Sequence, residues 1–272
     1  MNKDLAAAPP SRRSAIWLPH LSSRVFAVWQ RDFDVFRRLF WVSFAVPIVE
    51  PILYLLALGF GLGLFVKEIQ GIPYPRFIAP GLVSVAIMYG SFFECSYASF
   101  VRMYYQKTFD AIIATPVNLE EVVAGEILWG ATRATINATV VFLVVAAFGL
   151  SSPLHLAGIL PLAFLGGILF GSLGMISTAL IPSIDYFNIP IFLFLTPMFL
   201  FSGTFFPLEV LPQAAQKASF ALLPLTHMVK IARSLMLTRH DTGLLGSLLW
   251  IVVVALITFS LALYLMQRRL IK

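Results

Sequence analysis

The sequence predicts an all-α integral membrane protein with six transmembrane helices. Only 12% of its 272 residues are charged and 59% are hydrophobic, whereas soluble domains carry roughly 25% charged residues. Apolar stretches longer than about 18 residues recur along the chain, long enough for a helix to cross a bilayer. Basic residues gather at the two chain ends, beside apolar spans. We therefore expect membrane lipid, and not nucleic acid, as the partner of these charges.

The N-terminal part divides into two segments. Residues 1–21 are polar and proline-bearing and are expected to be disordered in the cytoplasm. Residues 22–41 carry aromatic side chains every three or four positions and charges on another face, which predicts an amphipathic helix at the membrane surface. A soluble helix packed on a domain is the alternative, but no soluble domain is available to receive it. The aromatic residues are Phe26, Trp29, Phe33, Phe36 and Phe40, and the charged ones Arg31, Asp34 and Arg38.

The transmembrane domain is expected to cover residues 42–266. Residues 207–242 are semi-polar and broken by Pro212 and Pro224, so we expect two short outer helices there, either lying on the surface or dipping into the lipid. A basic cytoplasmic tail follows at 267–272. The six spans are expected near residues 42–66, 77–101, 119–150, 155–181, 186–206 and 243–266.

The distribution of Lys and Arg predicts the orientation. Six spans place both termini on one side. That side holds seven basic residues in 1–41, two in 102–118 and three in 267–272, whereas the opposite loops hold six in total. Loops rich in Lys and Arg stay in the cytoplasm. We therefore expect both termini to be cytoplasmic.

The loop between spans two and three, residues 102–118, has a helical pattern up to Ala114. Thr115-Pro116 breaks it, because proline disfavours helix at the preceding residue. Asn118 followed by Glu121 is a capping-box pattern for the next helix. A short cytoplasmic helix joined rigidly to a span could transmit force from a partner protein. From these residues alone, an ordinary loop helix is equally compatible.

Three ionisable residues fall within apolar spans, where a bare charge costs at least a few kcal/mol. Counting the helical rise from the cytoplasmic end places Glu50 about 12 Å, Glu94 about 10 Å and Arg133 about 15 Å deep. Arg133 could therefore pair with Glu94 or Glu50. We favour a structural ion pair that fixes helix packing over contact with a substrate.

Two further patterns concern packing and the outer side. Gly167 and Gly171 have small-xxx-small spacing, which suits close helix packing either within or between subunits. His227, Lys230 and Arg233 recur every third residue after Pro224 and predict a cationic stripe. Anchoring at the membrane interface is favoured for the stripe over guiding an anionic headgroup or sugar outward.

Several motifs are absent from the sequence. It has no G-x-x-x-x-G-K-[ST] loop, H-E-x-x-H or G-x-S-x-G motif, and its four histidines are scattered. The single cysteine, Cys95, lies in an apolar run and is expected to act as a small hydrophobe. We therefore expect no catalytic, metal or cofactor site on this chain.

Several segments together resemble the permease subunits of ABC type-2 exporters, and within them the nodulation-protein-J-like branch. The similar segments are 48–63, YPRFIAPG at 74–81 and the 107–127 loop with Thr115-Pro116. The most specific is 194–212 with PLTH at 224–227. It contains the pattern P-x-x-x-x-S-G-x-x-F-P-x-x-x-x-P over Pro197, Ser202, Gly203, Phe206, Pro207 and Pro212.

The resemblance implies a six-helix half-transporter in the bacterial inner membrane. Residues 22–41 would be its elbow helix, 102–118 its coupling segment and 207–242 its outer re-entrant helices. Two copies would pair as a homodimer, and two separate ABC ATPase subunits would bind ATP and Mg²⁺, so this chain would not itself be an enzyme. The coupling residues implied are Tyr104, Tyr105, Lys107, Phe109, Asp110, Thr115 and Pro116. The outer gate implied is Pro197, Ser202, Gly203, Phe206 and Pro207.

The branch favours an amphipathic substrate, either a lipo-oligosaccharide or a lipid-linked glycan, while a drug or another lipid is also compatible. Phe92, Tyr97 and Phe199 are the candidate residues of the substrate path, together with the cationic stripe. An ion-coupled secondary transporter would need acidic groups near the midplane and usually inverted repeats. A membrane-embedded enzyme would need catalytic residues. Neither pattern is clear in the sequence.

Overall fold

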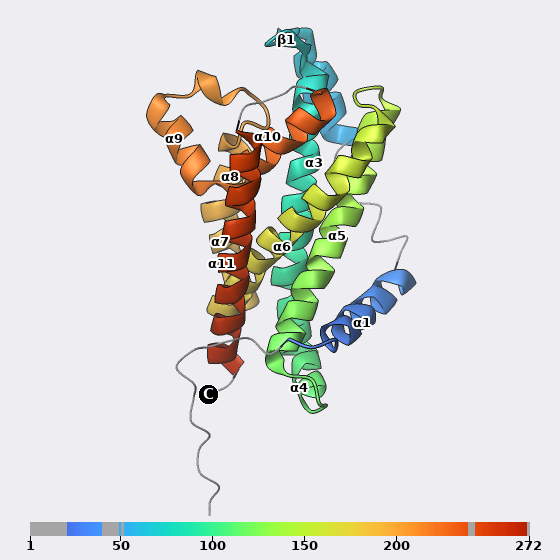
Figure 1. The fold of residues 1–272 in the computed structure, drawn as a ribbon, viewed down its shortest axis with the longest axis vertical. Helices are drawn as coiled ribbons and strands as arrows, with labels where there is room; N and C mark the ends of the chain where they lie inside the picture. Colours follow the sequence, from blue (N-terminus) through green and yellow to red (C-terminus); the bar gives the residue numbers. More distant parts are fainter. Residues whose placement is uncertain (1–20, 40–48, 50–51, 239–242, 271–272) are drawn as a thin grey trace, which may run out of the picture.

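The computed structural model describes residues 21–39, 49, 52–238 and 243–270. Within these residues the chain is a helical bundle with one small β-hairpin (Figure 1). Three of the sequence predictions lie outside the described residues. They are the N-terminal segment up to residue 20, Phe40 of the amphipathic helix, and most of the first half of span one including Glu50.

Five described helical segments are long and apolar enough to cross a membrane, in agreement with predicted spans two to six. A shorter apolar helix, Ile52–Leu64, lies within predicted span one. The segments α9 and α10 together pass the same test but are bent by 92°. The five spans are Tyr74–Tyr105, Leu119–Ala147, Pro153–Leu180, Ile184–Phe201 and Leu244–Leu270.

The elements follow one another with few long connections. The α-helices are α1 Val25–Arg38, α3 Tyr74–Phe93, α4 Thr108–Ile113, α5 Leu119–Ala147, α6 Leu156–Leu180, α7 Asn188–Pro190, α8 Thr196–Phe201, α9 Gln213–Leu222, α10 Pro224–Leu237 and α11 Leu244–Leu270. The π-helical stretches are η1 Leu55–Gly61, η3 Glu94–Ala98, η4 Val101–Tyr105 and η7 Ile191–Leu195. The 3-10 turns are η2 Leu62–Leu64, η5 Pro153–His155, η6 Ile184–Phe187 and η8 Leu208–Val210. The strands β1 Glu68–Ile69 and β2 Ile72–Pro73 pair antiparallel.

Helix α6 lies at the centre of the bundle and packs against α3, α5 and α11. Its glycines make this possible. A Cβ on Gly167 would lie 2.6 Å from the Cα of Ala131 in α5, and one on Gly174 would lie 2.6 Å from the carbonyl oxygen of Phe92 in α3. The small residues of α6 therefore serve packing within the chain, which resolves the alternative left open by the sequence.

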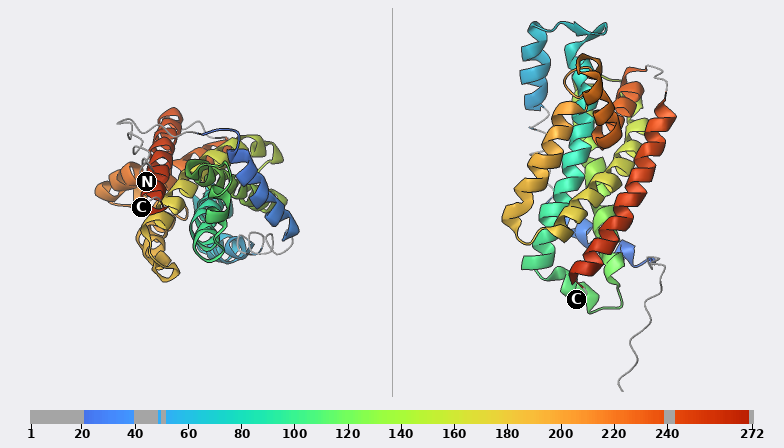
Figure 2. Two further views of the ribbon diagram at one scale, coloured as in Figure 1. Left: turned by 90° about the horizontal axis from the view of Figure 1, so that it is seen from below. Right: turned by 90° about the vertical axis from the view of Figure 1, so that its left-hand side faces the viewer.

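The two ends of the bundle differ. The short helix α4 and the last turn of α11 lie at one end, and the β-hairpin, α9 and α10 lie at the other (Figures 1 and 2). Helix α1 crosses α5 obliquely near the α4 end and packs on it. This arrangement agrees with the prediction that residues 102–118 and the C-terminal tail share one side.

The outer helices begin at the predicted prolines, and the second of them packs into the bundle. As expected, α9 begins after Pro212 and α10 begins at Pro224. Helix α10, however, packs against α3 and α11, and Leu225, Met228 and Ala232 are fully buried. Helix α10 is therefore part of the bundle core, because its apolar face meets α3.

The coupling segment is also shorter than expected. The predicted helix begins at Arg102, but the span helix continues through η4 to Tyr105, where Met103 is buried. Lys107 then adopts a left-handed backbone (φ 55°), which separates the span from α4. The separate helix covers only six residues.

Candidate functional site: a buried charge network at the α4 end

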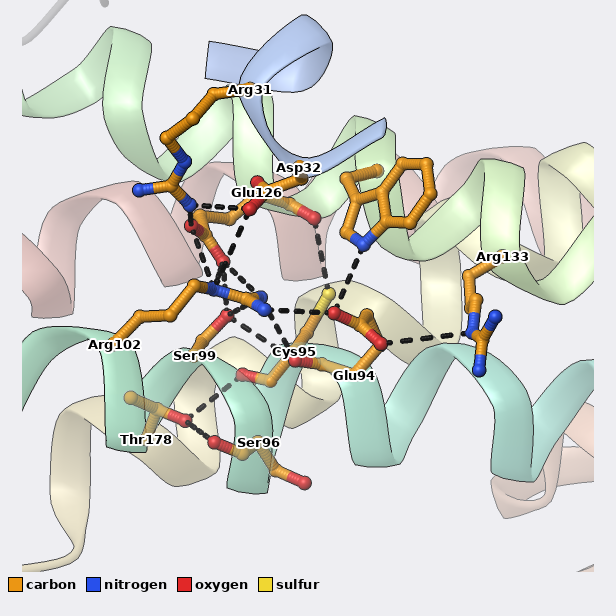
Figure 3. Close-up of polar contacts among 11 residues, drawn as sticks. Arg31, Asp32, Glu94, Cys95, Ser96, Ser99, Arg102, Glu126, Arg133 and Thr178 are labelled. Carbon is orange, nitrogen blue, oxygen red and sulfur yellow. Dashed lines mark hydrogen bonds and ion pairs between the residues drawn. The ribbon is translucent and has the colours of Figure 1, made fainter. Parts of the chain in front are cut away.

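A network of charged side chains joins α1, the π-helical end of span two and α5. Figure 3 shows these side chains pointing toward one another between the three elements. The members are Arg31, Asp32, Glu94, Arg102, Glu126 and Arg133. Equal numbers of acids and arginines let each charge be compensated, which a largely buried set requires.

Arg102 of η4 is the centre of the network. Its Nη2 atom lies 2.5 Å from Glu126 Oε2, and its Nη1 atom lies 2.9 Å from Glu94 Oε1. Its Nε atom is also 3.8 Å from Asp32 Oδ1. Arg31 completes the connection, since its Nη2 atom lies 3.1 Å from Glu126 Oε1 and also bonds Asp32. The guanidinium of Arg102 thus connects α1, span two and α5.

The predicted pairing of Arg133 is partly realised. Arg133 Nε lies 3.8 Å from Glu94 Oε2, which is an ion pair but too long for a hydrogen bond. Glu94 receives its short contacts from Arg102 and from the indole of Trp129 at 3.0 Å. The other predicted partner, Glu50, is outside the described residues.

Asp32 is the acid with the most perturbed environment in α1, which is not one of the spanning helices. Burial and, to a smaller extent, the negative charge of Glu126 raise its pKa to about 7, against the opposing effect of Arg102 and Arg31. Its Oδ2 atom is buried without a hydrogen-bond partner among the described residues. The carboxyl of Asp32 is therefore poised to change protonation near neutral pH.

Sequence reasoning missed Asp32, Glu126 and the central role of Arg102. A signal existed for Asp32, because it lies four residues after Val28 and four before Phe36, and all three are the buried face of α1. An acid within such a stripe indicates a buried partner. Glu126 gave no such signal, since its helix has no distinct apolar face.

The start of α1 is tied to the junction between α4 and α5. The backbone nitrogen of Ser22 donates to Glu121 Oε1 at 3.2 Å, and Arg24 donates to the carbonyl oxygen of Pro116. Glu121 also accepts from the backbone nitrogen of Asn118 at 2.8 Å, which confirms the predicted capping box. Burying the charged carboxylate of Glu121 costs free energy, and the hydrogen bonds from Ser22 and Asn118 offset this cost.

The predicted coupling residues fall into two groups. Phe109 is fully buried and anchors α4 in the core cluster beneath it. Thr115 donates from Oγ1 to the carbonyl oxygen of Ile112 at 2.6 Å and closes the end of α4. The remaining residues are exposed, and the Nζ of Lys107 lies over the ring of Tyr104. The exposed set is Tyr104, Tyr105, Lys107, Asp110, Thr115 and Pro116.

The predicted outer-gate residues lie in a tight turn after α8. Gly203 has φ +75° and Ser202 is buried. The carbonyl oxygen of Gly203 accepts a 2.7 Å hydrogen bond from Arg233 of α10, whose guanidinium also lies over the ring of Phe77 in α3. A Cβ on Gly81 of α3 would lie 2.7 Å from the side chain of Thr204 in the turn. Helices α3 and α10 therefore hold this turn. The remaining gate residues are Pro197 in α8 and Phe206 and Pro207, which are half-buried after it.

The predicted cationic stripe does not form a continuous outer face. His227 is 7% exposed, stacks on Trp250 of α11 at 4.3 Å and bonds the carbonyl oxygen of Phe220 through Nε2 at 2.8 Å. Lys230 lies over the ring of Phe220, and Arg233 faces Gly203. These side chains connect α10 to its neighbours.

A cleft of about 1040 Å³ opens beside the charge network, between α1, span two and α5. Tyr97, one of the predicted substrate-path residues, lines it. Phe199 lies outside the cleft wall, where it packs against Tyr54, Tyr89 and Phe205. Phe92 is 2% exposed, inside the core.

Cys95 is buried, and its thiol donates to the carbonyl oxygen of Glu126 at 3.4 Å, consistent with a small core residue. Among residues 21–39, 49, 52–238 and 243–270, no group of three or more His, Cys, Asp or Glu side chains is placed to hold a metal ion. The carboxylates of the network are held by arginines instead.

Comparison with known proteins places the chain in a family. The profile described as "ABC-2 type transporter" matches residues 23–237. The chain belongs to the ABC-2 type transporter family. It is 38% identical to nodulation protein J of Sinorhizobium fredii over 260 residues, which are 96% of this chain and 99% of the relative. It is 37% identical to nodulation protein J of Rhizobium meliloti over 90% of this chain and 93% of the relative.

A more distant relative is the inner membrane transport permease YadH of Escherichia coli, 24% identical over 86% of this chain and 91% of that protein. Family membership and the five apolar spans together identify the chain as a multi-pass membrane permease of an ABC transporter. The proteins of this family act in transport and are not enzymes themselves. The resemblance seen in the sequence is thereby confirmed.

Proposed function

We propose that this permease belongs to an ATP-driven exporter and is moved by a separate ABC ATPase that contacts α4. The observation that carries the proposal is the construction of α4. Phe109 anchors the helix in the core, while Tyr104, Tyr105, Lys107 and Asp110 around it are exposed. A helix that is fixed to the protein core on one face and exposes polar and aromatic side chains on the other can serve as a docking element for a soluble partner.

The charge network supports the transmission of a push from α4. Arg102 lies at the end of span two, five residues before the backbone turn at Lys107, and it bonds Glu126 of α5 and Glu94 of its own span. Helix α1 is joined to the same unit through Arg24 and Arg31. A displacement of α4 would therefore move span two, α5 and α1 together.

Family membership supports the proposed assembly. Two copies of this chain would pair as a homodimer, and two ATPase subunits would bind ATP and Mg²⁺ beneath them. A location in the bacterial inner membrane, with both termini in the cytoplasm, is supported by the name of the YadH relative and by the excess of basic residues on that side.

The substrate is proposed to be amphipathic and to move out of the cytoplasm or the inner leaflet. The likeness to nodulation protein J favours a lipo-oligosaccharide or a lipid-linked glycan, and a drug or another lipid would also suit an apolar path. The turn at 202–207, held by Arg233 and Gly81, is proposed as the outer gate.

The test is retention of an ATPase on the purified permease. The full chain is co-expressed with its operon neighbours, purified in mild detergent and assayed for a bound P-loop ATPase. Asp110→Arg and Tyr105→Ala, both at exposed positions of the α4 region, should each lower the amount retained by about tenfold or more. Glu209→Arg, an equally exposed charge reversal at the opposite end of the bundle, should not change it.

Two results would contradict the proposal. One is retention of the ATPase at the wild-type level by both Asp110→Arg and Tyr105→Ala. The other is transport by proteoliposomes that contain this chain alone, driven by a proton or sodium gradient, as an ion-coupled secondary transporter would show.

A further inference from the structure

The cleft beside the charge network has the features of a ligand site. Pockets that hold ligands usually measure roughly 300–1000 Å³ and are mostly apolar with a few polar groups. This cleft is about 1040 Å³, and aromatic side chains from three elements line it, including Phe36 of α1, Phe93 and Tyr97 of span two and Trp129 of α5. Its size and lining suit an acyl chain or a sugar ring.

Five charged side chains line the cleft: Arg31, Asp32, Glu94, Arg102 and Arg133. Arg31 and Arg102 pair with the acids at short distance, so Arg133 is the arginine of the cleft wall that is paired least closely. It lines the cleft, and its Nη1 atom is buried without a hydrogen-bond partner among the described residues. Its Nε atom faces Glu94 only at 3.8 Å, while Glu94 is bonded at shorter distance by Arg102 and Trp129. Figure 3 shows the two remaining nitrogens of Arg133 pointing away from the carboxylates.

The surroundings of Arg133 suit an anion. Its guanidinium lies 4.7 Å from the centre of the Phe36 ring, which fixes its plane at the cleft wall. Asn137, one turn further along α5, also lines the cleft and presents a side-chain amide. A guanidinium whose Nη1 atom has no hydrogen-bond partner among the described residues can donate to an oxygen of a phosphate, sulfate or carboxylate group.

We infer that the cleft between α1, span two and α5 binds an amphiphile with an acidic group, the acidic group on Arg133 and the apolar part against the aromatic wall. The inference deepens the proposed function, because it assigns a charge to the amphipathic substrate and a place where it is held. The cleft lies beside Arg102, so an occupant would contact the same network that connects to α4.

The test uses the full chain in dodecyl maltoside micelles and dodecyl phosphate as the probe, followed by titration calorimetry. The wild type should bind the probe saturably and should bind zwitterionic dodecylphosphocholine weakly. Arg133→Gln should weaken binding of dodecyl phosphate by roughly tenfold to a hundredfold, the usual size of a charge-assisted hydrogen bond. Arg133→Lys should bind dodecyl phosphate with an affinity between those of the wild type and Arg133→Gln, because lysine keeps the charge but lacks the paired donors of the guanidinium.

Arg37→Gln is the matched control, since Arg37 is an exposed arginine of α1 outside the cleft, and it should bind as the wild type does. If Arg133→Gln loses helical content or monodispersity, Ala98→Phe decides instead. Ala98 lines the cleft, and a phenyl group there should abolish binding by occupying the space.

Binding of equal strength in Arg133→Gln and the wild type would overturn the inference. So would the absence of saturable binding to the wild type, as expected if protein fills the cleft.

Competition with phosphatidylglycerol separates two supporting outcomes. Displacement of the probe identifies a resident lipid headgroup, and no displacement identifies a transported single-chain substrate. If ATPase retention succeeds while probe binding fails, the cleft assignment is wrong and the proposed function stands. If probe binding succeeds while ATPase retention fails, the proposed function is wrong and the cleft assignment stands.

Discussion

Val28 of α1 lies directly against Gly125 of α5. A Cβ added at Gly125 would lie 2.6 Å from the Cβ of Val28 and 3.0 Å from the carbonyl oxygen of Val25. Only glycine lets the two helices approach this closely. The approach also brings Asp32, one turn after Val28, to Glu126, the residue after Gly125. The position of the charge network therefore depends on one missing side chain.

Gly125→Ala should displace α1 and destabilise the permease by about 1–3 kcal/mol, the usual cost of overpacking. The midpoint of thermal unfolding in detergent measures this. Gly246→Ala is the matched control, because Gly246 is also helical but a Cβ there would meet nothing within 4 Å. An alanine at that site should be neutral or slightly stabilising. Equal midpoints for the two variants would contradict the packing described.

Glu126→Gln should be more damaging than any exposed charge change. The side chain of Glu126 is fully buried and pairs with Arg102 and Arg31. Removing one partner of a buried ion pair costs about 3–5 kcal/mol, because the other charge is left without compensation. We expect the unfolding midpoint to fall by on the order of 5–10 °C.

Asp34→Asn provides the comparison for this prediction, since Asp34 is an exposed acid of α1, and it should leave the midpoint unchanged. The double variant Glu126→Gln with Arg102→Gln should be less destabilised than the sum of the single variants, because each removes the partner of the other. Strict additivity would show that the two side chains do not interact.

The features predicted from sequence are those specified locally. The start of α5 follows from Asn118 and Glu121, which form a capping box within four residues. The spans follow from their apolar length. The two-helix reading of residues 213–237 follows from proline positions.

The features missed are those that need tertiary contacts. The aromatic face of α1 was expected to enter lipid, but Phe36 is buried against Trp129 of α5. Residues 207–242 were expected to form two short helices, either lying on the surface or dipping into the lipid, but the sequence did not show that α10 packs into the bundle. Its His227 instead finds an internal carbonyl oxygen and a stacking partner in Trp250. Neither partner can be located from a helical pattern alone.

The raised pKa of Asp32 predicts how stability depends on pH. The folded protein holds this proton up to about pH 7, whereas the unfolded chain releases it near its usual value of 3.8. As the pH rises between these values the unfolded state loses its proton first, so the free energy of unfolding falls. The wild type should therefore be most stable below this range, as far as this group is concerned, and should lose that contribution by pH 7.

Asp32→Asn removes the titrating group and keeps its shape. The unfolding midpoint of this variant should decline less between pH 5 and about 8 than that of the wild type. Asp34→Asn, at an exposed position of the same helix, should retain the wild-type slope. Parallel profiles for Asp32→Asn and the wild type would show that Asp32 does not titrate in this range.

The contact between Arg233 and Gly203 predicts a separate effect at the outer end. Arg233→Gln should destabilise the turn at 202–207 by about 1–3 kcal/mol, because it removes a charge-assisted hydrogen bond and the contact with Phe77. Backbone amides of the turn should exchange hydrogen faster, while those of α5 at the other end should not. Arg233→Lys should recover only part of the protection, since an ammonium cannot both stack flat on the ring and donate in the same plane. Lys217→Gln, an exposed cation on α9, should leave exchange unchanged. Faster exchange throughout the bundle in Arg233→Gln would instead mean that Arg233 stabilises the whole fold. That result would contradict the proposal that the turn at 202–207 is held separately as a gate.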